Sequence, residues 1–229
     1  MNDRLFFLSG LLGLGTLAIT LVLSLVGPDE IGPMAAGFTT PVLAFEFAES
    51  EAEVRALFGP EGSAAAMDRV NRWDFLYMVL YSLFLAVFAL AAALESDQYT
   101  PWIAAALPLL ILFADVMENM QLFRLTAQLG LDGGSMEPAL GRLHLFTWLK
   151  WGGLALYFVL ISGYFREQPG LWRIVWVAAD VPALLAIWAF FWRGQVHEYM
   201  ALSIGLLFLL LVVFAWWRAL TSGLQARGA

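Results

Sequence analysis

The chain has 229 residues, of which 61% are hydrophobic and 14% are charged, and its formal net charge is −7. A soluble domain needs more polar surface than this composition supplies, so most of the surface must face lipid. The absence of cysteine excludes disulfide scaffolds, thiolate metal sites and cysteine nucleophiles. Because the charge is negative and Lys and Arg do not cluster, we expect no nucleic acid partner.

The first apolar run covers residues 5–26 and follows a short start that carries Arg4. This run is longer than the apolar region of a typical signal peptide, which indicates an uncleaved signal anchor and a cytoplasmic N-terminus. Gly10, Gly13 and Gly15 within it predict a surface of small residues that another helix can approach closely.

The connection that follows is the only sizeable part predicted to lie outside the membrane. It opens with a run rich in Gly and Pro, and its later part, residues 34–71, is amphipathic. Ser50 and Glu53 have capping-box spacing ahead of apolar residues. We therefore predict two short amphipathic helices lying on the bilayer. No helix breaker follows Ser63, so the next transmembrane helix is predicted to begin there, before its apolar run.

Five further apolar runs are each long enough to cross a bilayer. They cover residues 73–94, 102–125, 143–164, 171–191 and 199–220. Trp and Tyr residues lie near their ends, as expected where helices meet lipid headgroups. We therefore predict an all-α, polytopic membrane helix bundle with about six transmembrane helices. It forms one integral membrane domain over residues 1–229, expected in a bacterial-type inner or plasma membrane.

The third run carries three polar side chains on one helical face. Asp115, Glu118 and Asn119 have the spacing i, i+3 and i+4, which places them on the same side of a helix. Lys150 lies inside the fourth run, too far from its end to reach water easily. A short connection joins the two runs, and counting about 1.5 Å per residue from it puts Glu118 and Lys150 at similar depths. We predict that these two pair, with Asp115, Glu118 and Lys150 as candidate catalytic residues.

Other polar residues extend this group into a predicted pocket in one half of the bilayer. Asp74, Tyr77 and Tyr81 have the spacing i, i+3 and i+7 in the second run, so they form one stripe. The amphipathic segment of the first connection is expected to cover the pocket. The candidate binding residues are Asp74, Tyr77, Tyr81, Asn119, Thr147, His144 and Glu46, with Arg124 beside them.

The remaining ionisable residues have simpler interpretations. Asp180 precedes Pro182 in the fifth run, where the missing backbone donor predicts a kink. His144 and His197 lie near helix ends, where interfacial hydrogen bonding explains them better than metal binding. The sequence has no zinc motif, dinucleotide fingerprint or phosphate-binding loop, so we predict no metal and no cofactor.

Three functions are open for this pocket. A membrane-embedded enzyme or binder would act on a lipid or lipid-like small molecule, with Asp115 or Glu118 as general acid or base and Lys150 adjusting its proton affinity. A small proton- or ion-coupled transporter or channel would use the carboxyl groups as ion sites. A structural or assembly protein would use them only to fix its helices. Membrane lipid is the expected partner, and the chain is also a candidate for self-association into a homo-oligomer.

Overall fold

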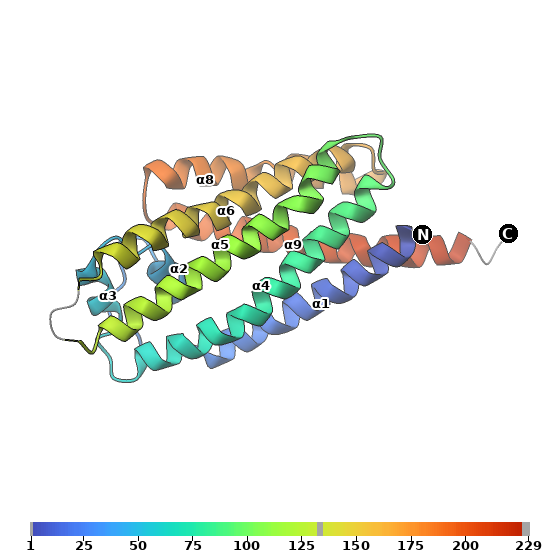
Figure 1. Ribbon diagram of the computed structural model, residues 1–229. Coiled ribbons are helices and arrows are strands. Elements are labelled where there is room, and N and C mark those ends of the chain that lie inside the picture. The colour runs from blue at the N-terminus through green and yellow to red at the C-terminus, as the bar shows by residue number, and fades with distance from the viewer. Residues whose placement is uncertain (1, 132–134, 226–229) are drawn as a thin grey trace.

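The structure is a computed structural model that describes residues 2–131 and 135–225. Within this part of the chain every regular element is a helix, and six helical segments are long and apolar enough to cross a membrane. They are α1 (Asn2–Val26), α4 (Ser63–Ala93), α5 (Thr100–Gln128), α6 (Glu137–Arg166), the segment Gly170–Phe191, and α9 (Gln195–Gln225). The predicted all-α bundle with six candidate membrane crossings is confirmed (Figure 1).

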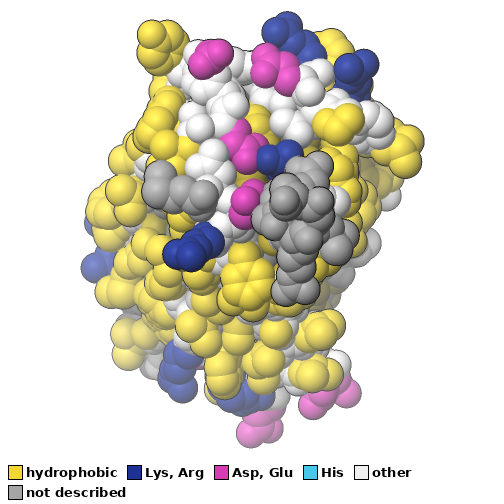
Figure 2. Space-filling model, turned by 90° about the vertical axis from the view of Figure 1, so that its right-hand side faces the viewer, with side chains coloured by type: hydrophobic (Ala, Val, Ile, Leu, Met, Phe, Trp, Pro, Cys, Tyr) yellow, Lys and Arg dark blue, Asp and Glu magenta, His cyan; other side chains and the backbone are white. Residues whose placement is uncertain are grey.

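Hydrophobic side chains form much of the outer surface of this bundle. Leu25, Leu109 and Phe191 are 84%, 70% and 68% exposed, and many other large apolar residues are similarly uncovered. Figure 2, which faces the end of the bundle that carries both termini, shows hydrophobic side chains over much of this face with charged ones among them. An apolar surface of this extent is stable in lipid and unstable in water, which supports a multi-pass membrane protein.

α1 packs closely against α4 and α9 through its glycines. A Cβ atom built on Gly13 would lie 2.5 Å from Val212 Cγ2 of α9, and one built on Gly10 would lie 3.0 Å from the Trp216 indole. The predicted close approach of another helix is therefore confirmed at these two positions. A Cβ on Gly15 would make only ordinary contact with Leu80.

The fifth crossing is interrupted in its middle. It consists of a short 3₁₀ turn η1 (Gly170–Trp172), α7 (Arg173–Ala178) and α8 (Val181–Phe191). Pro182 lies in the first turn of α8, where its missing backbone N–H leaves no hydrogen bond unmade. The predicted kink at Asp180 and Pro182 is thus confirmed as a break between two helices.

The first connection does contain two short helices, α2 (Pro41–Glu46) and α3 (Glu51–Leu57). Ser50 caps α3, since its Oγ accepts a hydrogen bond of 3.3 Å from the Glu53 backbone N–H. The prediction that these helices lie on the bilayer is wrong, because their apolar side chains are buried within the protein. Phe45 is 1% exposed and Val54 is fully buried. We call residues 39–58 the lid, since they close one end of the bundle.

α4 begins at Ser63, well before its apolar run, as predicted. This extension packs on the end of α5, where Thr126 Oγ1 donates a hydrogen bond of 2.8 Å to Asp68 Oδ1. The lid, the start of α4, the end of α5 and the start of α6 therefore lie at the same end of the bundle (Figure 1).

Candidate functional site

Lys150, near the middle of α6, lies among three carboxyl groups. Its Nζ is 2.9 Å from Glu46 Oε1 of the lid and 3.5 Å from Asp115 Oδ1 of α5, and it donates a short hydrogen bond to Glu118 Oε2. Trp151 Nε1 also donates to Glu46, to Oε2 at 2.9 Å. The structure thus brings Glu118 and Lys150 together, and Glu46 reaches them from the lid.

α4 contributes the stripe of Asp74, Tyr77 and Tyr81 to the same region. Tyr81 Oη donates a hydrogen bond of 2.5 Å to Asp115 Oδ2. Asn119 Nδ2 donates a hydrogen bond of 2.8 Å to Asp74 Oδ2. The Tyr77 and Tyr81 rings lie 5.2 Å apart between their centroids. α5 thus holds the carboxyl group of Asp74 through Asn119, and α4 holds that of Asp115 through Tyr81.

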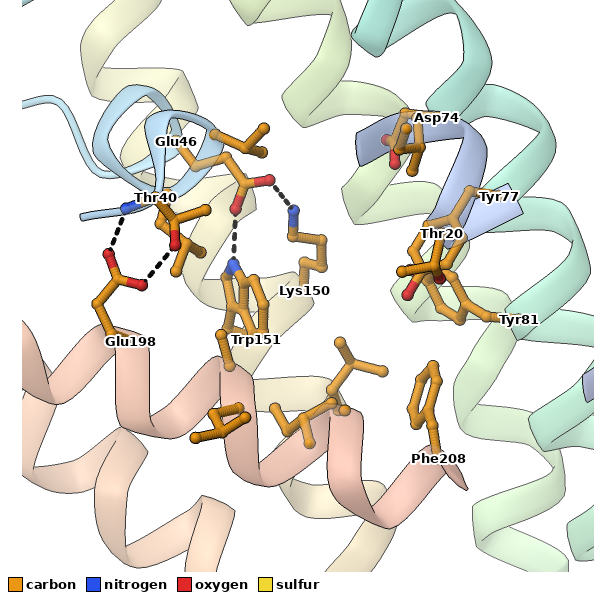
Figure 3. Close-up of a pocket in the computed structure, with 18 of the residues that line it drawn as sticks. Thr20, Thr40, Glu46, Asp74, Tyr77, Tyr81, Lys150, Trp151, Glu198 and Phe208 are labelled. Carbon is orange, nitrogen blue, oxygen red and sulfur yellow. Dashed lines mark hydrogen bonds and ion pairs between the residues drawn. The ribbon is translucent and has the colours of Figure 1, made fainter. Parts of the chain in front are cut away.

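These residues surround a cavity of about 640 Å³ (Figure 3). Its walls come from α1, the lid, α4, α5, α6 and α9, and most of the wall is apolar. The polar and aromatic lining includes Thr20, Thr39, Thr40, Glu46, Asp74, Tyr77, Tyr81, Asp115, Lys150, Trp151, Gln195, Glu198, Tyr199 and Phe208. The apolar lining includes Leu23, Val42, Leu43, Leu154, Ala201, Leu202 and Ile204, together with Gly205.

The candidate residues divide into two groups around this cavity. Glu46, Asp74, Tyr77, Tyr81, Asp115 and Lys150 line it. Glu118 and Asn119 lie behind the wall, 0% and 2% exposed. Thr147 also lies outside the cavity, fully buried, where its Oγ1 donates a hydrogen bond of 3.2 Å to the Glu46 carbonyl. Glu118, Asn119 and Thr147 contact Lys150, Asp74 and Glu46 respectively, and so hold these cavity residues in place.

The cavity opens sideways between α1 and α9. The two helices meet through the first half of α1 and the second half of α9, at Gly10 with Trp216 and at Gly13 with Val212. Toward the lid they lie farther apart (Figure 1), and the cavity fills the space between them. Leu202 at its rim is 60% exposed. Thr20 of α1 and Tyr199 and Gly205 of α9, which also line the cavity, are exposed as well, so the cavity is open to the outside between these two helices.

Aromatic rings close the floor of the cavity. Phe208 packs 5.9 Å from the Tyr81 ring and 6.0 Å from the rings of Phe84 and Phe158. Beyond this layer lies a separate polar group at the opposite end of the bundle, where Arg218 lies 2.5 Å from Glu95. In the described part of the chain, this aromatic layer separates the cavity from that group.

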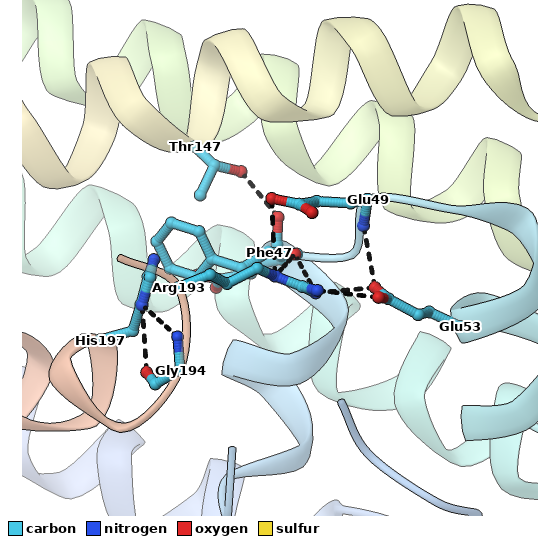
Figure 4. Close-up of polar contacts among 8 residues, drawn as sticks. Phe47, Glu49, Glu53, Thr147, Arg193, Gly194 and His197 are labelled. Carbon is cyan, nitrogen blue, oxygen red and sulfur yellow. Dashed lines mark hydrogen bonds and ion pairs between the residues drawn. The ribbon is translucent and has the colours of Figure 1, made fainter. Parts of the chain in front are cut away.

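The lid is held in place by Arg193, which precedes α9, and by Glu198 in the first turn of α9. Figure 4 shows the contacts of Arg193, and Figure 3 shows the contact of Glu198 with Thr40. Arg193 Nη2 donates hydrogen bonds of 2.6 Å to the Phe47 carbonyl and 2.7 Å to Glu53 Oε2. Partial burial alone raises the pKa of Glu53, but its hydrogen bonds from Arg193 and from the Glu49 backbone N–H outweigh burial and lower that pKa. Glu198 accepts a hydrogen bond of 2.6 Å from Thr40 Oγ1 at the start of α2.

The charge balance of the site is uneven. Glu46, Asp74, Asp115 and Glu118 bring four carboxyl groups near one ammonium group, that of Lys150. A surplus of negative charge in a largely buried group of side chains favours the approach of a cationic group. The arrangement can bind hydrogen-bond donors, exchange protons and neutralise a cation. Among the described residues, no group of three or more His, Asp or Glu side chains is arranged to hold a metal ion.

Other predicted residues lie apart from the cavity. His144 is exposed and lines a separate, smaller pocket with Trp148 and His197. Arg124 donates to Gln121 instead of to the cavity residues. Asp180 is exposed at the break between α7 and α8. The structure does not bring His144, Arg124 or Asp180 into the cavity.

Sequence reasoning missed the contribution of α9. Its first half supplies one side of the cavity, with Glu198 at the mouth and Phe208 at the floor (Figure 3). Gly205 faces open space, since a Cβ built on it would meet no atom within 4 Å. Glu198, near the start of α9, was the one residue in the sequence that indicated this role. An acidic side chain at the end of a membrane helix can accept hydrogen bonds from a neighbouring segment, as Glu198 does from Thr39 and Thr40.

Comparison of the chain with protein-family models, with curated proteins and with solved structures found no match. The case for a function therefore rests on the cavity and its side chains.

Proposed function

We propose that this multi-pass membrane protein binds one amphipathic, lipid-like small molecule in the cavity between α1, α4, α6 and α9. The polar end of the molecule meets Glu46, Asp74, Asp115 and Lys150, and its apolar part lies along α9 toward the lateral opening. The observation that carries the proposal is the combination of a charged group and apolar walls in one cavity of about 640 Å³.

The size and lining of the cavity support this proposal. Small-molecule sites are concave, mostly apolar and roughly 300–1,000 Å³ in volume, with a few polar groups that fix orientation. A purely structural network would need no space beside it, because close-packed side chains are more stable than a void. Lys150 and Asp115 instead border an open volume.

The opening supports a ligand that arrives from the membrane. It lies between α1 and α9, where Leu23 and Leu202 are the apolar residues that a lipid-like molecule would pass. The lid covers the polar end of the cavity, because Glu46 of α2 lies in the lid and also lines the cavity beside Lys150. An amphipathic molecule entering sideways would place its head under the lid without crossing the bilayer.

Acid–base catalysis on the bound molecule is a second candidate, and the geometry of Asp115 favours it. Asp115 Oδ2 accepts a 2.5 Å hydrogen bond from Tyr81, while Oδ1 accepts no hydrogen bond. The Asp115 carboxyl group borders the cavity with its Oδ1 3.5 Å from Lys150 Nζ, so it can take a proton from a bound molecule or give one to it. Tyr81 and Lys150 would stabilise the charge that results.

A transport pathway receives less support. Transport through the bundle requires polar groups on both sides of the midplane. The aromatic layer of Phe84, Phe158 and Phe208 lies across the direction that such a path would take. The polar site is instead a pocket with one floor and a lateral mouth.

Filling the cavity tests the proposal. Gly205→Phe would place a ring in the cavity, since a Cβ at this position meets no atom within 4 Å. Gly152→Phe is the matched control, because Gly152 of α6 is equally uncrowded and lies outside this cavity. We expect native mass spectrometry from a mild detergent to show one retained small molecule on the wild type and on Gly152→Phe, and none on Gly205→Phe.

The same experiment separates binding from catalysis. If the molecule retained by Asp115→Asn changes its mass when it is transferred to the wild type, Asp115 acts on the ligand. If the mass does not change, the site only binds. A wild-type protein that retains no small molecule from a total membrane extract, or a Gly205→Phe variant that retains the same one, would contradict the proposal.

A further inference from the structure

The cavity selects for the chemistry of the ligand's polar end. We propose that this head is a protonated amine that carries at least one N–H. The inference deepens the proposed function and depends on it, because it names the head group that the same cavity receives.

Charge is the first reason. Asp74 and Asp115 line the cavity, and Lys150 is the only Lys or Arg among the lining residues of the described chain. Lys150 already contacts Glu118 behind the wall and Glu46 from the lid. Its charge is therefore shared, and the two Asp carboxyl groups remain without a full positive partner. A cationic head entering the cavity supplies that partner.

Unfilled hydrogen-bond acceptors are the second reason. Asp115 is 2% exposed, yet its Oδ1 accepts no hydrogen bond, and the Lys150 ammonium lies 3.5 Å from it. Asp74 Oδ2 accepts a single hydrogen bond in this network, from Asn119. Buried carboxylate oxygens are stable when several donors reach them. An ammonium head provides N–H donors, which a quaternary ammonium head lacks.

Aromatic rings in the wall are the third reason. The Tyr77 and Tyr81 rings lie beside the two Asp residues, and the Trp151 ring lies beside Lys150, with Nζ 5.2 Å from its centroid. The faces of aromatic rings attract cations, and this attraction strengthens when water is excluded. Carboxyl groups and ring faces in one wall favour a cation over an anion or a neutral head.

The opposite choice of head fits this wall poorly. A carboxylate or phosphate head would bring a further negative charge toward Asp74 and Asp115, and like charges in a site of low polarity repel strongly. A hydroxyl head could donate one hydrogen bond, but it would leave the carboxyl groups without a positive partner.

The test uses three probes of equal chain length, dodecylamine, dodecanol and dodecanoic acid. Each is titrated into the protein in nanodiscs of phosphatidylcholine, and binding is followed by the shift in Tm. The Gly205→Phe variant measures the effect of each probe on the bilayer alone. We expect dodecylamine to raise the Tm of the wild type but not of Gly205→Phe, at concentrations about tenfold lower than dodecanol requires.

Two substitutions connect the preference to named groups. Asp74→Asn and Asp115→Asn should each weaken dodecylamine binding by about tenfold or more, and should change dodecanol binding little. Glu61→Gln is the control, since Glu61 is an exposed acidic residue outside the cavity.

The outcomes separate this inference from the proposed function. If dodecanol or dodecanoic acid binds as tightly as dodecylamine, and Gly205→Phe blocks it, the cavity binds amphiphiles but the amine head is wrong. If neither Asp substitution changes the preference, the amine head is also wrong. If no probe distinguishes the wild type from Gly205→Phe, the proposed function itself fails.

Discussion

Glu46 Oε1 lies 2.9 Å from Lys150 Nζ, so one ion pair joins the lid to the middle of a transmembrane helix. Both residues are less than a tenth exposed. Because of this contact, the position of the lid affects the charge of the Glu46 and Lys150 pair in the cavity, and that charge affects the position of the lid. A change in either residue is expected to alter both.

Removing Lys150 tests the strength of its ion pairs. Lys150→Met should lower the free energy of unfolding by about 3 kcal/mol, because Glu118 is fully buried and loses the cation that it contacts. The double variant Lys150→Met with Glu118→Leu should recover part of this loss, since the fully buried carboxyl group is then removed while Glu46 and Asp115 still lack the ammonium group. Unfolding in a denaturing detergent measures both, and a double variant no more stable than Lys150→Met would contradict the pairing.

Arg193 should control how often the lid opens. Arg193→Gln removes the hydrogen bonds to Phe47 and Glu53. The natural chain has no cysteine, so Ala44→Cys, which is buried in the lid, gives a single reporter. Its labelling by a maleimide should become about tenfold faster in Arg193→Gln, as expected for a loss near 1.4 kcal/mol.

The matched control is Arg55→Gln. Arg55 pairs with Glu51 on the surface of the same lid, with side chains 43% and 38% exposed, so its loss should leave the labelling rate nearly unchanged. Equal acceleration by both substitutions would show that Arg193 has no special role in closing the lid.

The attachment of Glu53 to Arg193 predicts a dependence of stability on pH. The pKa of Glu53 is lowered in the folded protein from its ordinary value of 4.5. A carboxyl group of this kind adds stability above its unfolded pKa, and that stability is lost as pH falls through the folded pKa. The wild type should therefore be more stable than Glu53→Gln at neutral pH, and the difference should shrink below pH 4.5. A difference that stays constant into acid would contradict the assignment.

The contact of α1 with α9 should tolerate no added methyl group at Gly13. Gly13→Ala places a Cβ 2.5 Å from Val212 Cγ2, and overpacking of this kind costs about 1–3 kcal/mol. Gly152→Ala adds the same atom where nothing lies within 4 Å, so it should be neutral. Thermal unfolding in nanodiscs compares the two, and equal Tm values would show that α1 moves aside without cost.

The bundle and the centre of the site could be predicted because both follow from local rules. Hydropathy and length identify the six crossings. Counting residues from the short connection between α5 and α6 placed Glu118 level with Lys150, and the structure pairs them. The stripe of Asp74, Tyr77 and Tyr81 follows helical spacing and faces one cavity.

The placement of His144 could have been excluded from spacing alone. His144 precedes Lys150 by six residues, which at about 100° per residue turns it roughly 240° around α6. Thr147, three residues before Lys150, lies on the same side as Lys150 and bonds to the Glu46 carbonyl. Closeness in the sequence placed His144 in the predicted pocket, although its helical face points elsewhere.

The lid and α9 required tertiary information. Arg193 and Phe47 are 146 positions apart, and no local pattern links them. One signal was present, since residues 42–48 are apolar except for Glu46. A helix on the bilayer has one polar face, whereas a nearly continuous apolar run is typical of a segment buried on all sides.

The lid also fixes an order of assembly. α2 leaves the ribosome before α4, yet the residues that hold the lid, Lys150, Arg193 and Glu198, are synthesised later. The segment therefore gains its full set of contacts only after the first turn of α9 has been synthesised. Closure of the cavity is therefore a late step in assembly, because a chain that ends before Arg193 lacks the contacts of Arg193 and Glu198 with the lid.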